Sequence, residues 1–450
     1  MSQPPRLDET PSRRGWQIGL FLEHLAEAAS LWEQRPADRL NPDLAWTDLG
    51  DEQDRLEAHL DALVLGGDLA LAVCRQQALD GDPGELHAAL RVFCRHGRSD
   101  LVGIAMEAVD PDDGEALDAM SEALVAELPA AWEVGALRPD LLDDPRRLRL
   151  AADLITSRGL GAGVLLDRLM DAPDGMRARL VRTLGRSADG TTLVALRPLL
   201  GDPAPSVRLE AAVALLRGGA PDAAATVLGA ARTDSALLPA FALAGTSAAI
   251  PWLHAVLAHP PTAPAAADVL GLMGDPSSVP PLIEAVEAGV EGAPWALALI
   301  TGAPFTEETT IEDIFDDDEL FDDERARREA GEPTGAPVFT TTVEGPSTDP
   351  ERWRAWWAEH ADAFAEADRW RQGLPAGPAS QVASLAAPFA PHRLRRWIAD
   401  ELAARYRLPL PFDPEADVAR QQAALAALTA WAEGTPFVPG RWYVGGHYVG

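Results

Sequence analysis

Lysine is absent from this chain of 450 residues, and all 38 basic residues are arginine. Phosphate-loop nucleotidases, protein kinases and pyridoxal-phosphate enzymes each use a lysine, either to hold a phosphate or to form an imine. Arginine does not replace lysine as a nucleophile, because its guanidinium group keeps its proton. The missing lysine therefore excludes these three enzyme classes.

Other residues that carry chemistry are few or scattered. The two cysteines, Cys74 and Cys94, lie in apolar stretches without a C-x-x-C motif, so no zinc site is indicated and a disulfide is possible but not favoured. No two of the nine histidines are four residues apart, and the motifs HExxH, GxSxG and GxGxxG are missing. We expect no catalytic residues, no metal, no cofactor and no enzymatic activity.

Long apolar runs are missing as well. No stretch reaches the roughly 18 uncharged apolar residues that a membrane span requires, and the start, MSQPPRLDETPSRRG, lacks the apolar core of a secretory signal. The net charge of −32 disfavours nucleic acid as the main partner, because phosphate binding depends on many basic contacts. We expect a cytoplasmic protein that contacts neither membranes nor nucleic acids.

Alanine and leucine dominate what is present. Hydrophobic residues make up 47% of the chain, enough for a sizeable core, but aromatic residues only 6%. This composition favours close-packed helices over sheets, which are rich in β-branched and aromatic residues. The predicted fold class is all-α.

An aspartate followed six residues later by an arginine recurs before apolar helical runs. The three pairs are 28 and 31 residues apart. A period of this length is typical of helix pairs that must stack to bury their apolar faces, which predicts an α-solenoid. The pairs are Asp143/Arg149, Asp171/Arg177 and Asp202/Arg208.

Small-residue turns keep the same period, beginning at positions 188, 219, 245 and 274. In the last of them, GDPSSVPPL, the Asp275 side chain can cap a helix and Pro276 can occupy its first position. The spacing, the Asp/Arg pairs and the Gly-Asp-Pro turns resemble HEAT repeats of the short, roughly 30-residue kind. The resemblance implies that these aspartates and arginines form a ladder between neighbouring repeats, which is a structural role.

The chain divides into six predicted parts. These are a disordered N-terminus (1–15), a helical module (16–65), degenerate helical repeats (66–135), the regular HEAT-like array (136–302), an acidic, disordered loop insertion (303–350) and a helical C-terminal repeat and cap with a short terminal hairpin (351–450).

The insertion carries a large share of the charge. Between Phe305 and Pro350 it has 15 acidic and 3 basic residues, a composition that keeps a loop solvated. Apolar residues among the carboxylates indicate instead a segment that docks on a partner or an arginine-rich groove, and a calcium site is a third interpretation. The candidate docking residues are Phe315, Asp316, Asp317, Asp318, Phe321, Asp322 and Asp323.

Three predictions concern the C-terminal part. Trp353, Trp356 and Trp357 share one helical face and should pack on the end of the array. A final helix should start at Asp413 and Pro414. The ending, GRWYVGGHYVG, predicts a hairpin that turns at two glycines.

The candidate partner-binding residues are arginines of the array. Arg179, Arg182 and Arg186 lie at i, i+3 and i+7, on one helical stripe, and Arg217 lies on the next repeat. Guanidinium groups suit carboxylates, either on a partner or on the acidic insertion, although such a stripe is also typical of a solvated face.

A wider resemblance covers most of the chain. The segments HLAEAASLW and RLEAHLDAL, the array, ALITG, WRAWWAEH and the arginine-rich last repeat resemble an uncharacterised family of bacterial HEAT-repeat proteins encoded among type VI secretion genes. The resemblance implies a non-catalytic scaffold or adaptor that binds a secretion-apparatus component or an effector. Two alternatives stay open, an immunity-type inhibitor of a basic toxin and a bilin-lyase-like enzyme.

Overall fold

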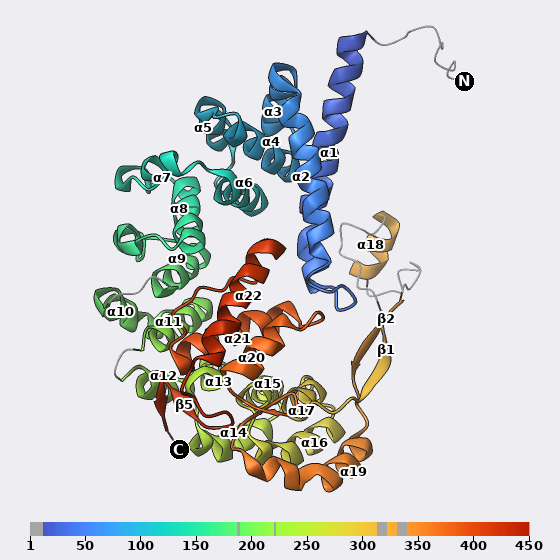
Figure 1. Ribbon diagram of the computed structural model, residues 1–450, viewed down its shortest axis with the longest axis vertical. Helices are drawn as coiled ribbons and strands as arrows, with labels where there is room; N and C mark the ends of the chain where they lie inside the picture. The colour runs from blue at the N-terminus through green and yellow to red at the C-terminus, as the bar shows by residue number, and fades with distance from the viewer. Residues whose placement is uncertain (1–11, 187–189, 220–221, 313–321, 331–339, 450) are drawn as a thin grey trace. The chain divides into compact units, whose positions relative to one another are not determined.

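The structure, a computed structural model, describes residues 12–186, 190–219, 222–312, 322–330 and 340–449. It divides into two compact units. Unit 1 comprises Met1–Gly245, Gln381–Phe437 and Tyr443–Gly450, and unit 2 comprises Thr246–Ser380 and Val438–Trp442. Both are built mainly of stacked helix pairs (Figure 1), which confirms the all-α solenoid fold class. The predicted array of 136–302 is divided between the units after Gly245.

Unit 1 begins with two long helices and continues as a succession of helix pairs. Its elements are α1 (Arg13–Leu40), α2 (Leu49–Leu65), α3 (Gly67–Asp80), α4 (Pro83–Arg95), α5 (Ser99–Ala108), α6 (Gly114–Glu127), α7 (Ala130–Ala136), α8 (Pro145–Arg158), α9 (Asp174–Arg186), α10 (Gly190–Leu196), α11 (Pro205–Gly218), α12 (Ala223–Ala231), α13 (Ala240–Ala244), α20 (Pro378–Ala386, whose first residues belong to unit 2), α21 (His392–Tyr406), α22 (Val418–Glu433), β5 (Tyr443–Val444) and β6 (His447–Tyr448).

Local sequence sets where these helices begin and end. Helix α1 starts inside the segment 1–15 predicted as disordered, because the Ser12 hydroxyl accepts a hydrogen bond from the Gly15 amide at 3.1 Å. In α11, Pro205 occupies the first turn, where its missing amide hydrogen costs nothing. The residue after the helix, Gly219, has a φ of 63° that favours glycine and ends the helix there.

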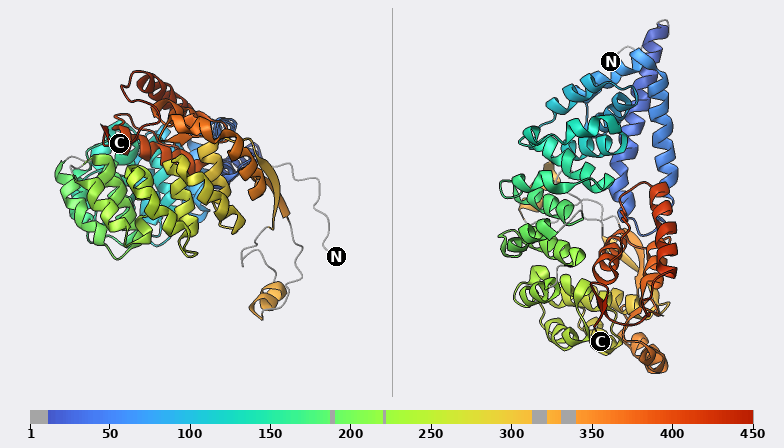
Figure 2. Two further views of the ribbon diagram at one scale, coloured as in Figure 1. Left: turned by 90° about the horizontal axis from the view of Figure 1, so that it is seen from below. Right: turned by 60° about the vertical axis from the view of Figure 1, so that its left-hand side comes forward.

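Helices α4, α6, α8, α9 and α11 pack on one another in succession as the inner layer of unit 1, and the other helix of each pair lies outside. The right-hand view of Figure 2 shows this stacking from blue to green. Apolar side chains fill the space between the layers, among them Leu154, Leu180, Leu184, Ala211 and Leu215. Such apolar residues recur at helical spacing, so the periodicity of the sequence is enough to predict that they are buried.

Helices α9 and α11 approach most closely at Gly185. A methyl group added there would lie 2.3 Å from the Cβ atom and 2.9 Å from the Cα atom of Ala214. We expect Gly185→Ala to lower the free energy of unfolding by about 1–2 kcal/mol, because an overpacking cost of about 1–3 kcal/mol exceeds the gain in helix propensity of up to about 1 kcal/mol. Urea denaturation followed by circular dichroism measures the change.

The reciprocal variant is the control for this prediction. Exchanging the two side chains, Gly185→Ala with Ala214→Gly, keeps the volume between the helices and the number of glycines in them constant. It should recover most of the lost stability. Equal stability of the single variant and the unchanged protein would contradict the close contact.

The C-terminal segment of unit 1 packs on the inner helices. Helix α21 contacts α11 and α13, and β5 pairs with β6 in an antiparallel register, at the residues where the sequence predicts a hairpin. Arg405 of α21 is fully buried and donates hydrogen bonds to the carbonyl oxygens of Ala242 (2.7 Å), Gly245 (3.1 Å) and Tyr443 (3.1 Å). It thereby caps the carboxyl end of α13, where carbonyl oxygens lack helical partners.

The same segment also reaches the first two helices of unit 1. The Arg39 guanidinium donates to the main-chain oxygen of Glu415 (3.1 Å), the Trp46 indole donates to the oxygen of Ala387 (3.2 Å), and the Val418 amide donates to the Gln53 side chain (2.9 Å). Residues 387–418 therefore join the N-terminal helices of unit 1 to its later repeats.

The final helix starts later than predicted. Helix α22 begins at Val418 rather than at Asp413 and Pro414, and residues 407–417 form a loop. The Glu415 amide is held by the Asp413 side chain at 3.2 Å, a local hydrogen bond that competes with helix formation. The prediction was wrong because the Asp-Pro pair closes a turn here.

The cysteines are not paired. Cys74 and Cys94 are both buried free thiols of unit 1, and burial raises the pKa of each to about 12. A thiol with such a pKa is a poor nucleophile, so both act as small hydrophobic residues.

Unit 2 continues the helix pairs and adds short strands. Its elements are α14 (Ile250–Leu257), α15 (Ala263–Met273), α16 (Val279–Glu287), α17 (Ala293–Thr301), β1 (Thr306–Glu312), α18 (Asp322–Glu329), β2 (Thr340–Pro346), α19 (Pro350–His360), β3 (Trp370–Arg371) and β4 (Leu374–Pro375). Asp275 caps the turn before α16 by accepting the Ser277 amide at 2.9 Å, with Pro276 in first position, which confirms the predicted cap. Arg369 and Arg371 donate to Met273 (2.9 Å) and Leu272 (2.8 Å) at the end of α15.

Within 303–350, where the sequence predicts a loop insertion, the described residues include two strands and helix α18. Strands β1 and β2 pair in antiparallel register, from Thr306 with Pro346 to Glu312 with Thr340. Threonine and other β-branched residues dominate both strands and favour this conformation. The amide of Ser347 donates to the oxygen of Phe305 at 3.0 Å and closes the base of the insertion.

Helix α19 carries the three tryptophans of the predicted helical face. Trp353 is 1% exposed, and its indole nitrogen donates to the Ser347 oxygen at 2.7 Å. Its ring meets that of Phe305 edge to face, with 5.3 Å between centroids. Trp356 and Trp357 are only half-buried. Helix α19 contacts α16 of the array, and the rings that the tryptophans meet are those of Phe305, His360 and Phe364.

Candidate functional site

A cavity of about 420 Å³ lies within unit 1, between α1, α4, α6, α8 and α9 and the C-terminal segment. Its volume falls within the range of sites for small ligands or peptide side chains. Arginines line it in unusual number for a chain with a net charge of −32. Its charged lining residues are Arg35, Arg39, Arg91, Arg179, Arg182, Arg186, Arg396, Arg420, Asp118, Glu122, Asp153, Asp413, Glu415 and Asp417.

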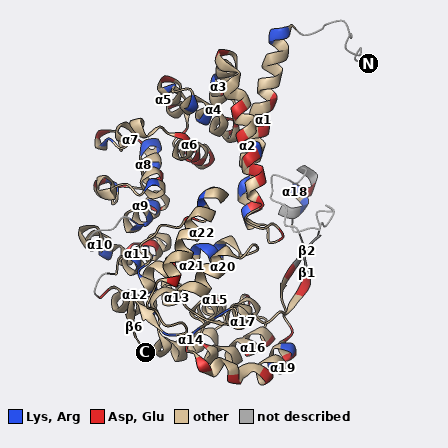
Figure 3. Cartoon of the chain, viewed as in Figure 1, with Lys and Arg blue, Asp and Glu red and all other residues tan. Residues whose placement is uncertain are grey.

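The predicted stripe of three arginines on α9 lines this cavity. Figure 3 colours the basic residues of the chain blue and the acidic residues red. Two of its members have partners within the chain. Arg179 forms an ion pair with Asp153 of α8, and Arg182 forms one with Glu210 of α11, with 3.0 Å between Nε and Oε1. These carboxylates come from neighbouring repeats, so the two arginines also link inner helices.

Arg186 differs from its neighbours on the stripe. In the part of the chain that the structure describes, no carboxylate forms an ion pair with it. Burial lowers the pKa of its guanidinium, Asp413 opposes this effect and Arg217 adds to it. An arginine still carries its charge at neutral pH, so Arg186 places a poorly compensated cation beside the cavity.

Arg217 lies outside the main cavity. It contacts Asp400 of α21 at 2.5 Å and lines a second cavity of about 270 Å³, which Arg186 also lines. Three of the four predicted partner-binding arginines are therefore engaged by carboxylates of unit 1. Sequence reasoning missed these contacts because they join residues 26 to 183 positions apart.

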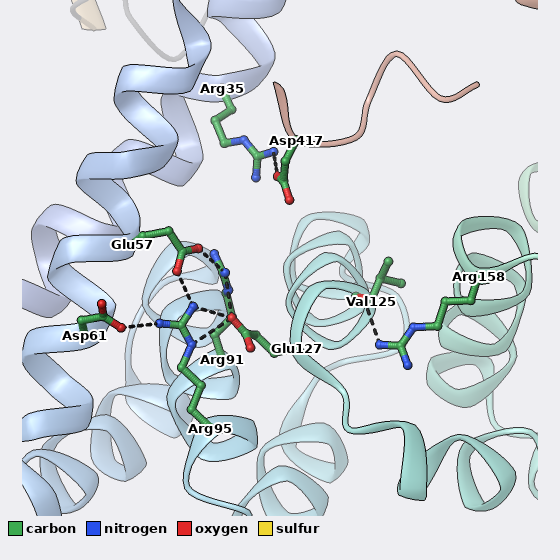
Figure 4. A network of polar contacts seen from close by, with 9 residues as sticks. All are labelled: Arg35, Glu57, Asp61, Arg91, Arg95, Val125, Glu127, Arg158 and Asp417. Carbon is green, nitrogen blue, oxygen red and sulfur yellow. Dashed lines mark hydrogen bonds and ion pairs between the residues drawn. The ribbon is translucent and has the colours of Figure 1, made fainter. Parts of the chain in front are cut away.

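A dense ion-pair network borders the cavity at α2, α4 and α6 (Figure 4). Arg91 and Arg95 both contact Glu57 and Glu127, and Arg95 also reaches Asp61 at 3.0 Å. Burial alone would raise the pKa of Glu127, but the two guanidinium groups hold it below its usual value. Arg91 is thus a structural cation with its charge satisfied, in contrast to Arg186.

His87 is a buried imidazole in the cavity wall that the sequence did not single out. It is 1% exposed and stacks on Trp32 with 5.3 Å between ring centroids. Its Nδ1 atom has no hydrogen-bond partner among the described residues. Complete burial holds the pKa of His87 well below its usual range, and Arg91 and Arg35 lower it further, so the ring is neutral.

Lowered histidine pKa values make stability depend on pH. The pKa values of His59, His87 and His392 are all lowered, first of all by burial. The unfolded chain binds protons at these imidazoles as the pH falls below about 6.5, whereas the folded chain does not. We expect the urea midpoint to be lower at pH 5.5 than at pH 7.5.

The variant His87→Phe tests the largest of these contributions. Phenylalanine can stack on Trp32 but cannot take up a proton. The difference between the two urea midpoints should therefore become smaller in this variant. An unchanged difference would show that His87 does not contribute.

Two of the arginines predicted to form a ladder contact an aspartate of the next repeat. Arg177 contacts Asp202 at 3.1 Å and Arg208 contacts Asp234 at 2.5 Å, each in the next repeat. Asp234 lies 32 residues after Asp202, a signal that could have found it. The remaining predicted members differ: Arg149 contacts Asp118 and Asp153, Asp143 contacts Arg168, and no ion pair of Asp171 is seen within the described ranges.

The candidate docking residues of the insertion fall largely outside the described residues. Phe315, Asp316, Asp317, Asp318 and Phe321 lie there, and Asp322 and Asp323 begin α18. Among the residues that are described, no group of three or more metal-binding side chains comes together.

No described helix combines the length and the apolar character needed to cross a bilayer.

A comparison with curated proteins finds no match. The family model for HEAT repeats matches residues 163–244, the segment of unit 1 that contains α9 and α11 and therefore the arginine stripe. The matched segment, with its stacked helix pairs, is therefore similar to HEAT repeats.

Proposed function

We propose that this protein is a non-catalytic scaffold or adaptor that binds an acidic segment of a partner protein through the arginine-lined cavity of unit 1. One observation carries this proposal: eight arginines gather around one cavity, and Arg186 among them has no ion pair within the described chain. HEAT repeats commonly bind proteins along their inner helices, where this cavity lies.

The resemblance to proteins encoded among type VI secretion genes suggests the partner class. A sheath, baseplate or effector protein with an exposed acidic segment would complement the cavity. Guanidinium groups form bidentate hydrogen bonds with carboxylates, and this geometry gives such a contact its specificity.

Pull-down from the native host tests the proposal. Full-length tagged protein would be cross-linked to its partners at low and moderate salt, and the partners would be identified by mass spectrometry. We expect a partner cross-linked near α9, with less recovered at moderate salt because exposed charges are screened. Arg186→Glu should reduce its recovery at least tenfold.

Arg197 provides the matched control. It is an exposed arginine of unit 1 outside the cavity, paired with Asp222. Arg197→Glu makes the same change of charge and should leave recovery unchanged. Equal recovery with Arg186→Glu, or recovery of no partner at all, would contradict the proposal, and a partner from outside the secretion apparatus would contradict its narrower form.

A further inference from the structure

The loop between α21 and α22 places acidic residues at the arginine-lined cavity. Asp413, Glu415 and Asp417 occur at every second position and all three line it. The loop is fixed on both sides of these residues, because Phe412 and Val418 are buried. The chain thus holds a short acidic segment of its own against the site where a partner's acidic segment is proposed to bind.

Across the described part of the chain, the carboxylates of this resident segment form one long ion pair with the cavity arginines, and the Asp413 side chain accepts the Glu415 amide at 3.2 Å. Asp417 lies 3.8 Å from Arg35 and remains half-exposed. Glu415 is held through its main-chain oxygen, which accepts from Arg39 at 3.1 Å. Within the described residues, neither Asp413 nor the Glu415 side chain forms an ion pair with an arginine.

Other carboxylates around the same cavity are bound tightly. Asp153 contacts Arg179 directly, and Asp118 contacts Arg149. The contrast separates two sets of arginines. One set has its charge satisfied by the fold, and the other, Arg35, Arg39 and Arg186, faces acidic side chains at a distance.

We infer that the segment 413–417 is an internal stand-in for the partner, and that the natural ligand is an acidic peptide segment that displaces its carboxylates from Arg35, Arg39 and Arg186. The three arginines come from two helices, α1 and α9, so a chain with carboxylates at alternate positions matches their spread better than a single small anion. The inference rests on the proposed function and adds the chemical pattern of the partner.

Competition follows from this arrangement. The resident carboxylates are part of the same chain and so act at a high effective concentration. Their partial neutralisation of the arginines lowers the affinity for any incoming acidic segment. Removing the charge of these three carboxylates should therefore strengthen binding of an acidic peptide, even though the three residues are themselves part of the binding surface.

Fluorescence polarisation with the full-length protein tests the inference. The probe is a labelled synthetic peptide with the chain's own sequence from 408 to 418. We expect the variant Asp413→Asn, Glu415→Gln, Asp417→Asn to bind it at least tenfold more tightly than the unchanged protein does. Adding Arg186→Gln to that variant should remove most of the gain.

Two controls keep the result interpretable. The same peptide with its three acids replaced by amides should bind neither protein, and circular dichroism should show equal folding of all variants. The single variant Glu415→Gln, which leaves the turn-forming Asp413 in place, should show an intermediate gain. Equal affinities of the neutralised and unchanged proteins would overturn the inference.

Inorganic phosphate is the competing ligand. If phosphate displaces the peptide at equal concentration, the site takes a small anion, and the inference of a peptide ligand is overturned. The two proposals can fail separately. If recovery of a host partner depends on Arg186 but the neutralised and unchanged proteins bind the peptide equally, the proposed scaffold function stands. The inference that a partner displaces segment 413–417 is then overturned.

Discussion

Replacing Arg405 with alanine is expected to lower the free energy of unfolding by about 3–5 kcal/mol, the effect of breaking a buried ion pair by removing one partner. Arg405 and Glu401 are both fully buried and lie 3.2 Å apart. The change leaves the Glu401 carboxylate without this cation and three carbonyl oxygens without this donor. Urea denaturation followed by circular dichroism measures the loss.

A second variant separates the two causes. Arg405→Met with Glu401→Leu removes both charges but still leaves the carbonyl oxygens of Ala242, Gly245 and Tyr443 without this donor. It should be more stable than Arg405→Ala and less stable than the unchanged protein. The exposed pair of Arg98 and Asp100 is the control, since Arg98→Ala should have little effect. A loss below about 1 kcal/mol for Arg405→Ala would contradict the assigned role.

Trp353→Ala should destabilise unit 2 by about 3–5 kcal/mol, because it removes a large buried ring and leaves a cavity. The indole also joins the two ends of the insertion, since it donates to Ser347 and packs against Phe305. We therefore expect faster cleavage between residues 303 and 350 in limited proteolysis, in addition to the lower urea midpoint.

Two variants check this assignment. Trp353→Phe keeps an aromatic ring against Phe305 but loses the hydrogen bond to Ser347, so it should cost about 1–2 kcal/mol. Trp357→Ala changes a half-buried ring on the same helix and should have a smaller effect on cleavage. Unchanged cleavage of Trp353→Ala would show that the indole does not hold the insertion.

The repeat architecture could be predicted because it depends on residues that are close together in the sequence or recur at a regular spacing. Apolar residues recur at helical spacing, and the Asp275 cap acts on an amide two residues away. The ladder between Arg177 and Asp202 follows the same period as the helices, so a repeating pattern indicates it.

The cavity could not be predicted in this way. Its arginines were identified as a stripe, but their partners come from distant positions, such as Asp400 for Arg217. The start of α22 was misplaced because Asp413 and Pro414 are typical of both a helix start and a turn. His87 has no motif around it, and only the fold shows that it is buried beside the cavity.

The contacts of residues 39–53 with residues 387–418 have a consequence for synthesis. The hydrogen bonds join positions 341 to 376 residues apart. At about 5–20 residues per second, a ribosome takes roughly 20–70 s to produce the second partner after the first has emerged. During the later part of that interval, the helices from α1 to α13 exist without the segment 381–437. The arginine stripe of the nascent chain is then uncovered, and an acidic client present at the ribosome would meet no internal competitor.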